Sequence, residues 1–291
     1  MMRRIAKWTL RLLLVLFAVG ILYIVILVFP SPLFAHNESY GTYRVYSDEP
    51  IPADFGRVIE DLDRRIQGME HAPPEASQRI YLCGSKRYTF FAFLLRMGPE
   101  SLAIGLSVAN ETFVSVDRVR LFAARNQGVF RHTRFEGNLG EVVAHEVAHF
   151  NSVHALSYRV HLRQPLWKSE GWAEYQANLA AIRADPEYDL GRRIELLLDD
   201  SYWDGRHGMA RRMWESQLLV EFLGEVKGYR LTDIIRDDVS LSSTREQMMA
   251  WYGHRLPFSS SDQLSTTRTS TGPSGSPCLT IRNRSSSSEI S

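Results

Sequence analysis

The segment from Glu141 to Phe150, EVVAHEVAHF, constrains the fold more than any other part of the chain. It holds His145 and His149 four positions apart, with Glu146 directly after the first histidine. Residues four apart share one face of a helix, so both imidazoles can reach one metal ion and Glu146 can point toward the same open coordination position. Apolar residues surround these groups, which predicts a buried helix. Buried polar groups must be paired, and a metal ion would pair these.

A second segment, PLWKSEGWAEY from Pro165 to Tyr175, supplies candidates for a further ligand. Catalytic zinc usually takes three protein ligands and leaves the fourth position for water. Glu170 begins a helical pattern in this segment, and Glu174 follows four residues later. We therefore expect the third ligand to come from here.

Together the two segments resemble the gluzincin metallopeptidases, whose signature is HExxH followed downstream by a WLxEGxAEY-like segment. The matching residues are His145, Glu146, His149, Trp167, Glu170, Gly171, Ala173, Glu174 and Tyr175. The resemblance implies that His145, His149 and Glu170 bind Zn²⁺ and that Glu146 is the catalytic general base. It also implies that Glu174 is the carboxylate that orients a ligating histidine.

Neighbouring peptidase classes do not fit these residues. A metzincin continues HExxHxxGxxH, whereas this chain has Ser152 and Ala155 where that glycine and third histidine belong. The large aminopeptidases of the gluzincin group carry a GxMEN segment shortly before HExxH. The nearest echo, residues 68–71, lies too far upstream. An endopeptidase is therefore preferred over an exopeptidase.

The N-terminus carries an uncharged apolar run at residues 12–29, close to the roughly 20 residues that span a bilayer. Four basic residues lie in the preceding segment, residues 1–11, which the positive-inside rule places in the cytoplasm. A cleaved signal peptide is the competing interpretation, but Leu33-Phe34-Ala35 is a poor cleavage site. We expect an uncleaved single-pass anchor, with the chain from Ser31 onward periplasmic or otherwise extracytoplasmic.

Between the anchor and a Ser/Thr-rich tail, expected to be disordered from residue 256 to 291, residues 36–255 form one expected domain. Apolar periodicity and turn residues predict strands over 41–47, 79–83, 101–108 and 112–116, and helices over 54–69, 169–183, 192–198, 211–226 and 244–252. The helix that holds His145 should begin after Asn138, which forms a capping box with Glu141.

This order predicts an α+β fold. The family resemblance implies a zincin-like arrangement, in which a small twisted mixed sheet packs on the HExxH helix and a helical subdomain follows. The strand Thr112 to Val116 is the candidate for the edge that lines the cleft, where an extended peptide could add as another strand. An ordinary core strand is the alternative for this segment.

A donor for the oxyanion of the reaction is also needed, and no motif selects one. The candidates are Tyr158, Tyr202, His207, Tyr229, Tyr252 and His254. His154 and His161 lie between the two ligand segments, but no helical register joins them to His145, so we expect them in loops.

The sequence thus predicts a membrane-anchored zinc metallopeptidase that hydrolyses peptide bonds of a peptide or protein substrate outside the cytoplasm. The alternatives are a zincin-fold hydrolase of a non-protein amide and a non-catalytic anchored binding protein. The second alternative is disfavoured because His145, Glu146, His149 and Glu170 are all present. A formal net charge of +1 gives no basic surplus for nucleic acid, and no oligomer is inferred because the apolar run lacks a small-xxx-small pattern.

Overall fold

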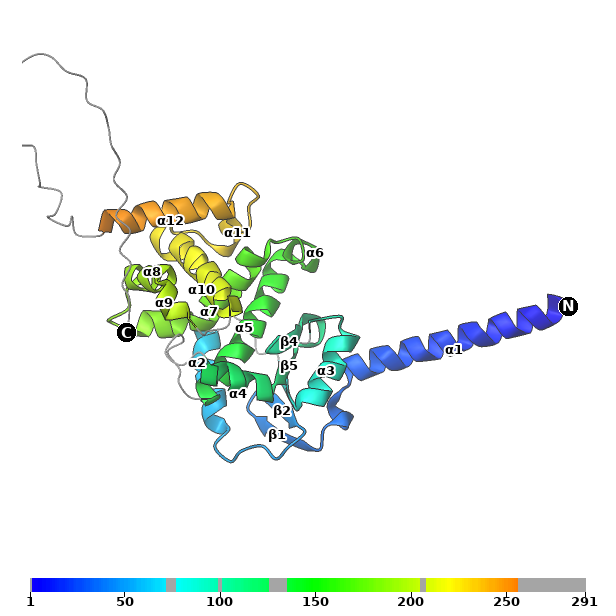
Figure 1. Ribbon diagram of the computed structural model, residues 1–291. Helices are drawn as coiled ribbons and strands as arrows, with labels where there is room; N and C mark the ends of the chain where they lie inside the picture. Colours follow the sequence, from blue (N-terminus) through cyan, green and yellow to red (C-terminus); the bar gives the residue numbers. More distant parts are fainter. Residues whose placement is uncertain (1, 72–76, 99–100, 126–134, 205–207, 256–291) are drawn as a thin grey trace, which may run out of the picture. The chain divides into compact units, whose positions relative to one another are not determined.

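The structure is a computed structural model that describes residues 2–71, 77–98, 101–125, 135–204 and 208–255. His207 and the tail from residue 256 lie outside the described residues. The described chain is mixed α+β, with one small mixed sheet flanked by helices and a long helix that leaves the domain at the N-terminus (Figure 1).

The sheet has five strands in the order β1-β2-β3-β5-β4. Their bounds are β1 His36–Tyr40, β2 Tyr43–Ser47, β3 Gln78–Cys83, β4 Ala103–Leu106 and β5 Glu111–Ser115. The neighbours β2, β3 and β5 are parallel, whereas β1 and β4 pair antiparallel at the two edges. All four predicted strands are confirmed, and β1, which is polar and largely exposed, was not predicted.

The prediction that Thr112 to Val116 forms the edge strand is wrong. All of them except Val116, which begins α4, belong to β5, which lies between β3 and β4 and has all five of its residues buried. Its apolar side chains face both sides of the sheet, with Val114 on one face and Phe113 on the other. A strand that is buried on both faces belongs in the sheet interior, and the shorter β4 takes the edge instead.

Helices cover both faces of the sheet. On one face, α2 (Gly56–Gln67) and α5 (Phe135–Leu156) pack against Ile80 and Val114. On the other, Tyr88 and Phe91 of α3 (Ser85–Leu94) pack against Phe113. The helix α5 therefore lies with one side on the sheet, and its middle carries the HExxH motif.

The predicted start of α5 after Asn138 is wrong, because the helix already begins at Phe135. A capping box marks a position where a helix can begin, but nothing in it stops the preceding residues from continuing the helix. The N-terminus of α5 therefore lies upstream of the expected position, and the motif lies in mid-helix.

The C-terminal half is helical, as predicted. Its longer helices are α7 Leu166–Ala184, α8 Leu190–Leu198, α10 Gly208–Glu221 with a π-helical turn over Phe222–Val226, and α12 Leu241–Arg255. Three single-turn helices in this half were not predicted, namely α6 Tyr158–His161, α9 Asp200–Trp203 and α11 Leu231–Ile234, nor was α4 Val116–Arg125, which precedes α5. The helix α7 joins two cores: Ala173 and Ala177 pack in the core under the sheet, and Trp172, Tyr175 and Leu179 pack in the helical one.

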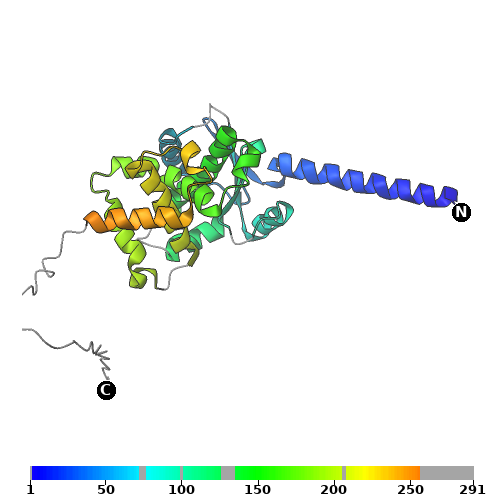
Figure 2. The ribbon, with the colours of Figure 1, turned by 90° about the horizontal axis from the view of Figure 1, so that it is seen from above.

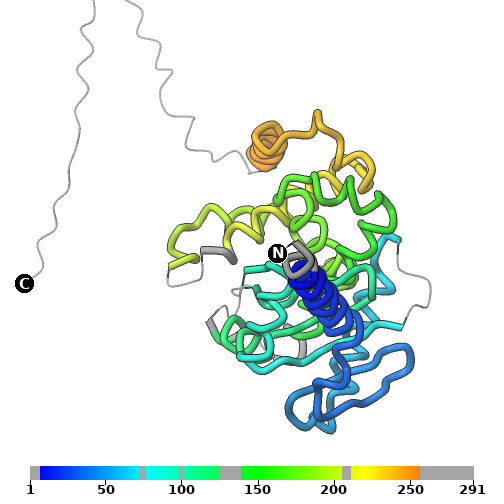
Figure 3. Tube along the Cα trace, turned by 90° about the vertical axis from the view of Figure 1, so that its right-hand side faces the viewer, coloured from blue at the N-terminus to red at the C-terminus, as the bar shows by residue number. Residues whose placement is uncertain are grey.

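The N-terminal helix α1 (Met2–Val28) contains, over Lys7–Val28, the one described helix that is long and apolar enough to cross a membrane. Its 22 residues correspond to about 33 Å, against about 30 Å for the bilayer core. Figures 1 and 2 show α1 leaving the domain as a straight rod, and Figure 3 looks nearly along its axis. Its last turns contact α3, where the Tyr23 hydroxyl donates to the Leu94 carbonyl at 2.6 Å.

Candidate metal centre

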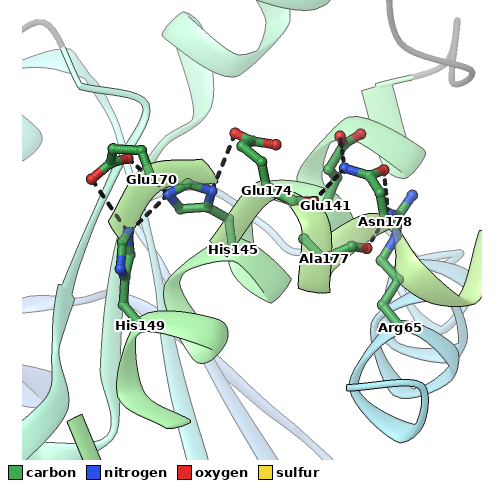
Figure 4. Close-up of polar contacts among 8 residues, drawn as sticks. All are labelled: Arg65, Glu141, His145, His149, Glu170, Glu174, Ala177 and Asn178. Atoms are coloured by element: carbon green, nitrogen blue, oxygen red, sulfur yellow. Dashed lines mark hydrogen bonds and ion pairs between the residues drawn. The ribbon is translucent and has the colours of Figure 1, made fainter. Parts of the chain in front are cut away.

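Three predicted ligands converge on one point (Figure 4). His145 and His149 lie one turn apart on α5, and their Nε2 atoms are 3.0 Å from each other. Glu170, near the start of α7, places Oε2 3.3 Å from Nε2 of His145 and Oε1 3.6 Å from Nε2 of His149. These ligand atoms lie within 4.8 Å of one another, so the group can hold one metal ion.

The donor chemistry of this cluster fits a cation. The Nδ1 atom of His145 faces Glu174, so a proton there leaves Nε2 with a lone pair that faces His149 and Glu170. An ionised carboxylate has lone pairs and no proton, and two facing imidazole nitrogens can share at most one proton favourably. Electron-pair donors that converge without enough protons between them are satisfied by a metal ion.

Electrostatics favour positive charge at the same place. Burial disfavours the charged imidazolium, but Glu174 and Glu170 outweigh burial and raise the pKa of His145 well above its usual value. Burial alone would raise the pKa of Glu170, but hydrogen bonds and charges from His145 and His149 outweigh it and lower that pKa strongly. The pocket therefore stabilises a positive charge, whether a proton or a metal ion carries it.

Glu174 lies one helical turn beyond Glu170 and faces the far side of His145, with Oε1 3.1 Å from Nδ1. The distance suits an ion pair, although the oxygen lies off the line of a good Nδ1–H hydrogen bond. A carboxylate at this position fixes which imidazole nitrogen carries the proton and leaves the other free to bind metal. The structure thus separates the two glutamates: Glu170 faces both histidines, and Glu174 faces one of them from behind.

A buried polar network fixes the helix that carries Glu174 (Figure 4). The Asn178 amide donates to the Glu174 carbonyl at 3.0 Å and to Oε1 of Glu141 on α5 at 2.9 Å. Arg65 on α2 donates to the Ala177 carbonyl at 2.7 Å and to Oδ1 of Asn178 at 3.3 Å. Burial raises the pKa of Glu141, and the Arg65 charge opposes that shift. The network ties α2, α5 and α7 together directly behind the cluster.

Glu146 faces the same cavity as the cluster, beside the edge strand β4. Burial raises the pKa of its carboxyl, opposed by His145 and His149 and by a hydrogen bond from the backbone N–H of Gly105. A Cβ at position 105 would lie 2.6 Å from Oε2 of Glu146 and 2.5 Å from the Phe150 ring, so only glycine lets β4 approach this closely. Sequence reasoning missed Gly105, although a glycine inside a predicted strand is a signal of close approach.

The cavity has a volume of about 600 Å³ and lies between β4 and the helices α4, α5, α6 and α7. Ala103, Ile104 and Gly105 form its β4 wall. Among the described candidates for the oxyanion donor, Tyr158 lines this cavity, whereas the others do not. Those others are Tyr202, Tyr229, Tyr252 and His254.

His154 and His161 are helical, so their expected placement in loops is wrong. His154 lies in the last turn of α5, and His161 ends α6. The chain reverses at Ser157, which has a φ of 75°, and this reversal brings the His161 ring to 5.5 Å from the ring of His149. Periodicity within one helix cannot foresee a contact that a reversal between two helices creates.

The tautomer of His161 follows from its partner. Ser152 Oγ donates to the His149 carbonyl at 2.8 Å, so it accepts from Nδ1–H of His161 at 2.9 Å, and Nε2 of His161 keeps its lone pair. Burial, with help from the nearby His149, lowers the pKa of His161 to about 4, so the ring is neutral at neutral pH. His161 therefore offers an acceptor, not a charge, beside the cluster of His145, His149 and Glu170.

Comparison of the chain with protein-family models gives no match, and comparison with curated proteins gives no match either. The resemblance to the gluzincins stays a prediction carried by the two motifs.

Proposed function

We propose that this protein is a membrane-anchored zinc metallopeptidase of the gluzincin type that hydrolyses peptide bonds outside the cytoplasm. The observation that carries the proposal is the convergence of His145, His149 and Glu170 in a cavity that also holds Glu146. The mixed sheet packed on α5, with a helical half behind it, agrees with a zincin-like fold.

Two imidazoles and one carboxylate are a ligand set that zinc accepts. Zinc, when bound, supplies a Lewis acid and lowers the pKa of a bound water toward neutrality. His145, His149 and Glu170 would hold it, and Glu174 would hold His145 in the required tautomer.

Glu146 is the proposed general base. Its carboxylate takes a proton from the attacking water and delivers it to the leaving nitrogen, so that one residue acts in both halves of the reaction. Burial raises its pKa above the usual value, which makes it a better proton acceptor than a solvent-exposed glutamate. Gly105 holds it by the backbone N–H.

The edge strand β4 is the proposed binding site for the substrate backbone. One side of β4 pairs with β5, and no described strand pairs with the other, while Ala103, Ile104 and Gly105 line the cavity. An extended peptide can add to such an edge through backbone hydrogen bonds, which places its carbonyl groups along the cavity. This geometry favours a polypeptide substrate over a small non-protein amide.

The proposed anchor is α1, oriented with the basic residues before it in the cytoplasm. Everything from Ser31 onward then lies on the opposite side of the membrane, where the active site would meet exported or surface proteins.

The test is hydrolysis of a peptide library by the full-length protein in detergent micelles with zinc, read by mass spectrometry. Glu146→Gln should retain metal and lose about 10²-fold or more of the cleavage rate. Glu246→Gln, an exposed acid on α12, is the matched control and should cleave normally. A fully active Glu146→Gln enzyme would exclude the general-base role. A zinc-loaded wild type that cuts no peptide would favour the non-protein amide or the binding protein.

A further inference from the structure

The helix α3 exposes an apolar face. Phe93 is 79% exposed and Phe90 is 43% exposed, and being three residues apart they lie on the same side of the helix. Met97, just after the helix, is 50% exposed. Exposed neighbouring aromatic residues of this size mark an interaction surface in a water-soluble domain.

The same helix lies against the end of α1. Ile26 and Leu27 of α1 pack on the core that Phe91 of α3 helps to form. The Tyr23 hydroxyl reaches the Leu94 carbonyl, and Tyr23 lies five residues, about 7.5 Å, before the end of α1 at Val28. Figures 1 and 2 both show α3 beside this end of α1. If the bilayer covers α1 up to Val28, the C-terminal end of α3 lies at or below the surface of that bilayer.

The last carbonyl groups of α3 all have hydrogen-bond donors, as a position inside a bilayer requires. A helix leaves its last four carbonyl groups without partners within the helix, and in lipid no water is present to donate hydrogen bonds to them. Here the carbonyls of Phe91, Ala92, Phe93 and Leu94 each accept a hydrogen bond. Their donors are the N–H groups of Leu95, Met97 and Arg96 and the hydroxyl of Tyr23. The last donor comes from the anchor helix itself.

We propose that the exposed face of α3, formed by Phe90, Phe93 and the adjoining Met97, is a second membrane contact that enters the same bilayer as α1. The inference rests on the membrane anchoring in the proposed function. Exposed Lys86 and Arg96 flank this face, where basic side chains meet lipid headgroups favourably.

This contact would hold the mouth of the cavity at the membrane surface. Met97 belongs both to the exposed face and to the cavity wall. Leu162 and Leu166, which are 64% and 76% exposed, also line the cavity. The substrate class that fits an apolar mouth at this position is a polypeptide segment at the surface of the membrane.

The test places a fluorophore at single positions of the full-length protein in phosphatidylcholine vesicles, part of whose lipid carries a nitroxide quencher on its acyl chains. Cys278→Ser provides the background, because the remaining Cys83 is fully buried. An NBD label is attached at Phe93→Cys, at Val19→Cys in α1, or at Leu198→Cys on α8. Leu198 is an exposed apolar residue of α8, and α8 lies at the end of the domain away from α1 (Figure 1).

We expect the nitroxide to quench the labels at positions 93 and 19 and to leave the label at position 198 bright. A label at Met97→Cys repeats the readout with both phenylalanines intact. If the labels at 93 and 97 keep as large a fraction of their fluorescence in the presence of nitroxide as the label at 198 does, while the label at 19 is quenched, the second contact is refuted and the anchor stands. If position 19 itself is not quenched, the anchoring is refuted and the inference fails with it.

Discussion

Replacing Gly171 with alanine should destabilise the protein and loosen the metal site, because α7 and α10 meet at this residue without room for a side chain. A Cβ at position 171 would lie 2.3 Å from the Ser216 carbonyl oxygen and 2.9 Å from Cγ2 of Val220. Ordinary contacts begin at 3.4 Å, so the shortfall against the oxygen is 3.4 − 2.3 = 1.1 Å. Because that oxygen belongs to the backbone of α10, no side-chain rotation relieves it, and the helices must separate.

The magnitude follows from two opposing effects. Overpacking of this kind costs about 3 kcal/mol at the upper end of its usual range, and the better helix propensity of alanine returns about 1 kcal/mol. The net loss of about 2 kcal/mol lowers the Tm of a domain of this size by about 4–8 °C. Since Glu170 is the adjacent residue, separation of α7 from α10 also displaces a proposed metal ligand and should weaken zinc binding.

The assay is thermal unfolding of the full-length protein in detergent by circular dichroism, together with a zinc-competition titration. Gly253→Ala is the matched control, because a Cβ there meets nothing within 4 Å and the position is also helical. It should raise stability slightly, by up to about 1 kcal/mol. The reasoning is refuted if Gly171→Ala is as stable as Gly253→Ala and binds zinc as tightly as the wild type.

Three further substitutions separate the roles of other carboxyl groups. Glu170→Ala should abolish tight zinc binding, whereas Glu174→Ala should weaken it by about 10–100-fold, as measured by competition with a chelator; the reverse ranking would invert the ligand assignment. Glu111, fully buried on β5, has a pKa raised to about 7 by burial, against opposing effects of Arg79 and Tyr81. The folded chain therefore keeps the Glu111 carboxyl protonated up to about pH 7, whereas the unfolded chain releases this proton near pH 4.5. The stabilisation of the folded state that results is complete below pH 4.5 and is lost as pH rises toward 7. The unfolding free energy of the wild type should fall by about 3 kcal/mol more than that of Glu111→Gln over this range, and parallel pH curves for the two proteins would contradict the assignment.

Local patterns predicted much of the fold. The spacing of His145 and His149 placed both on one face of a helix, and the structure has them on α5 with their Nε2 atoms 3.0 Å apart. The motif at residues 165–175 identified Glu170 and predicted a helix over 169–183, and α7 spans this range. These features are local in sequence, so periodicity and motif spacing are sufficient to find them.

The features that were missed depend on contacts between distant segments. The edge strand is β4 and not β5, because strand order is decided by how the strands pack and not by their individual composition. Gly105 matters because β4 comes close to Glu146 on α5, and His161 reaches His149 through the reversal at Ser157. The network of Arg65, Glu141 and Asn178 joins three helices that no single motif connects.

The most direct test of the central claim is the metal content of the purified full-length protein, by elemental analysis, for the wild type and His145→Ala. His154→Ala is the matched control, since it changes an exposed histidine on the same helix. We predict about one zinc ion per chain in the wild type and in His154→Ala, and none in His145→Ala. A folded wild type that binds no zinc, or that binds another metal in preference, would contradict the account.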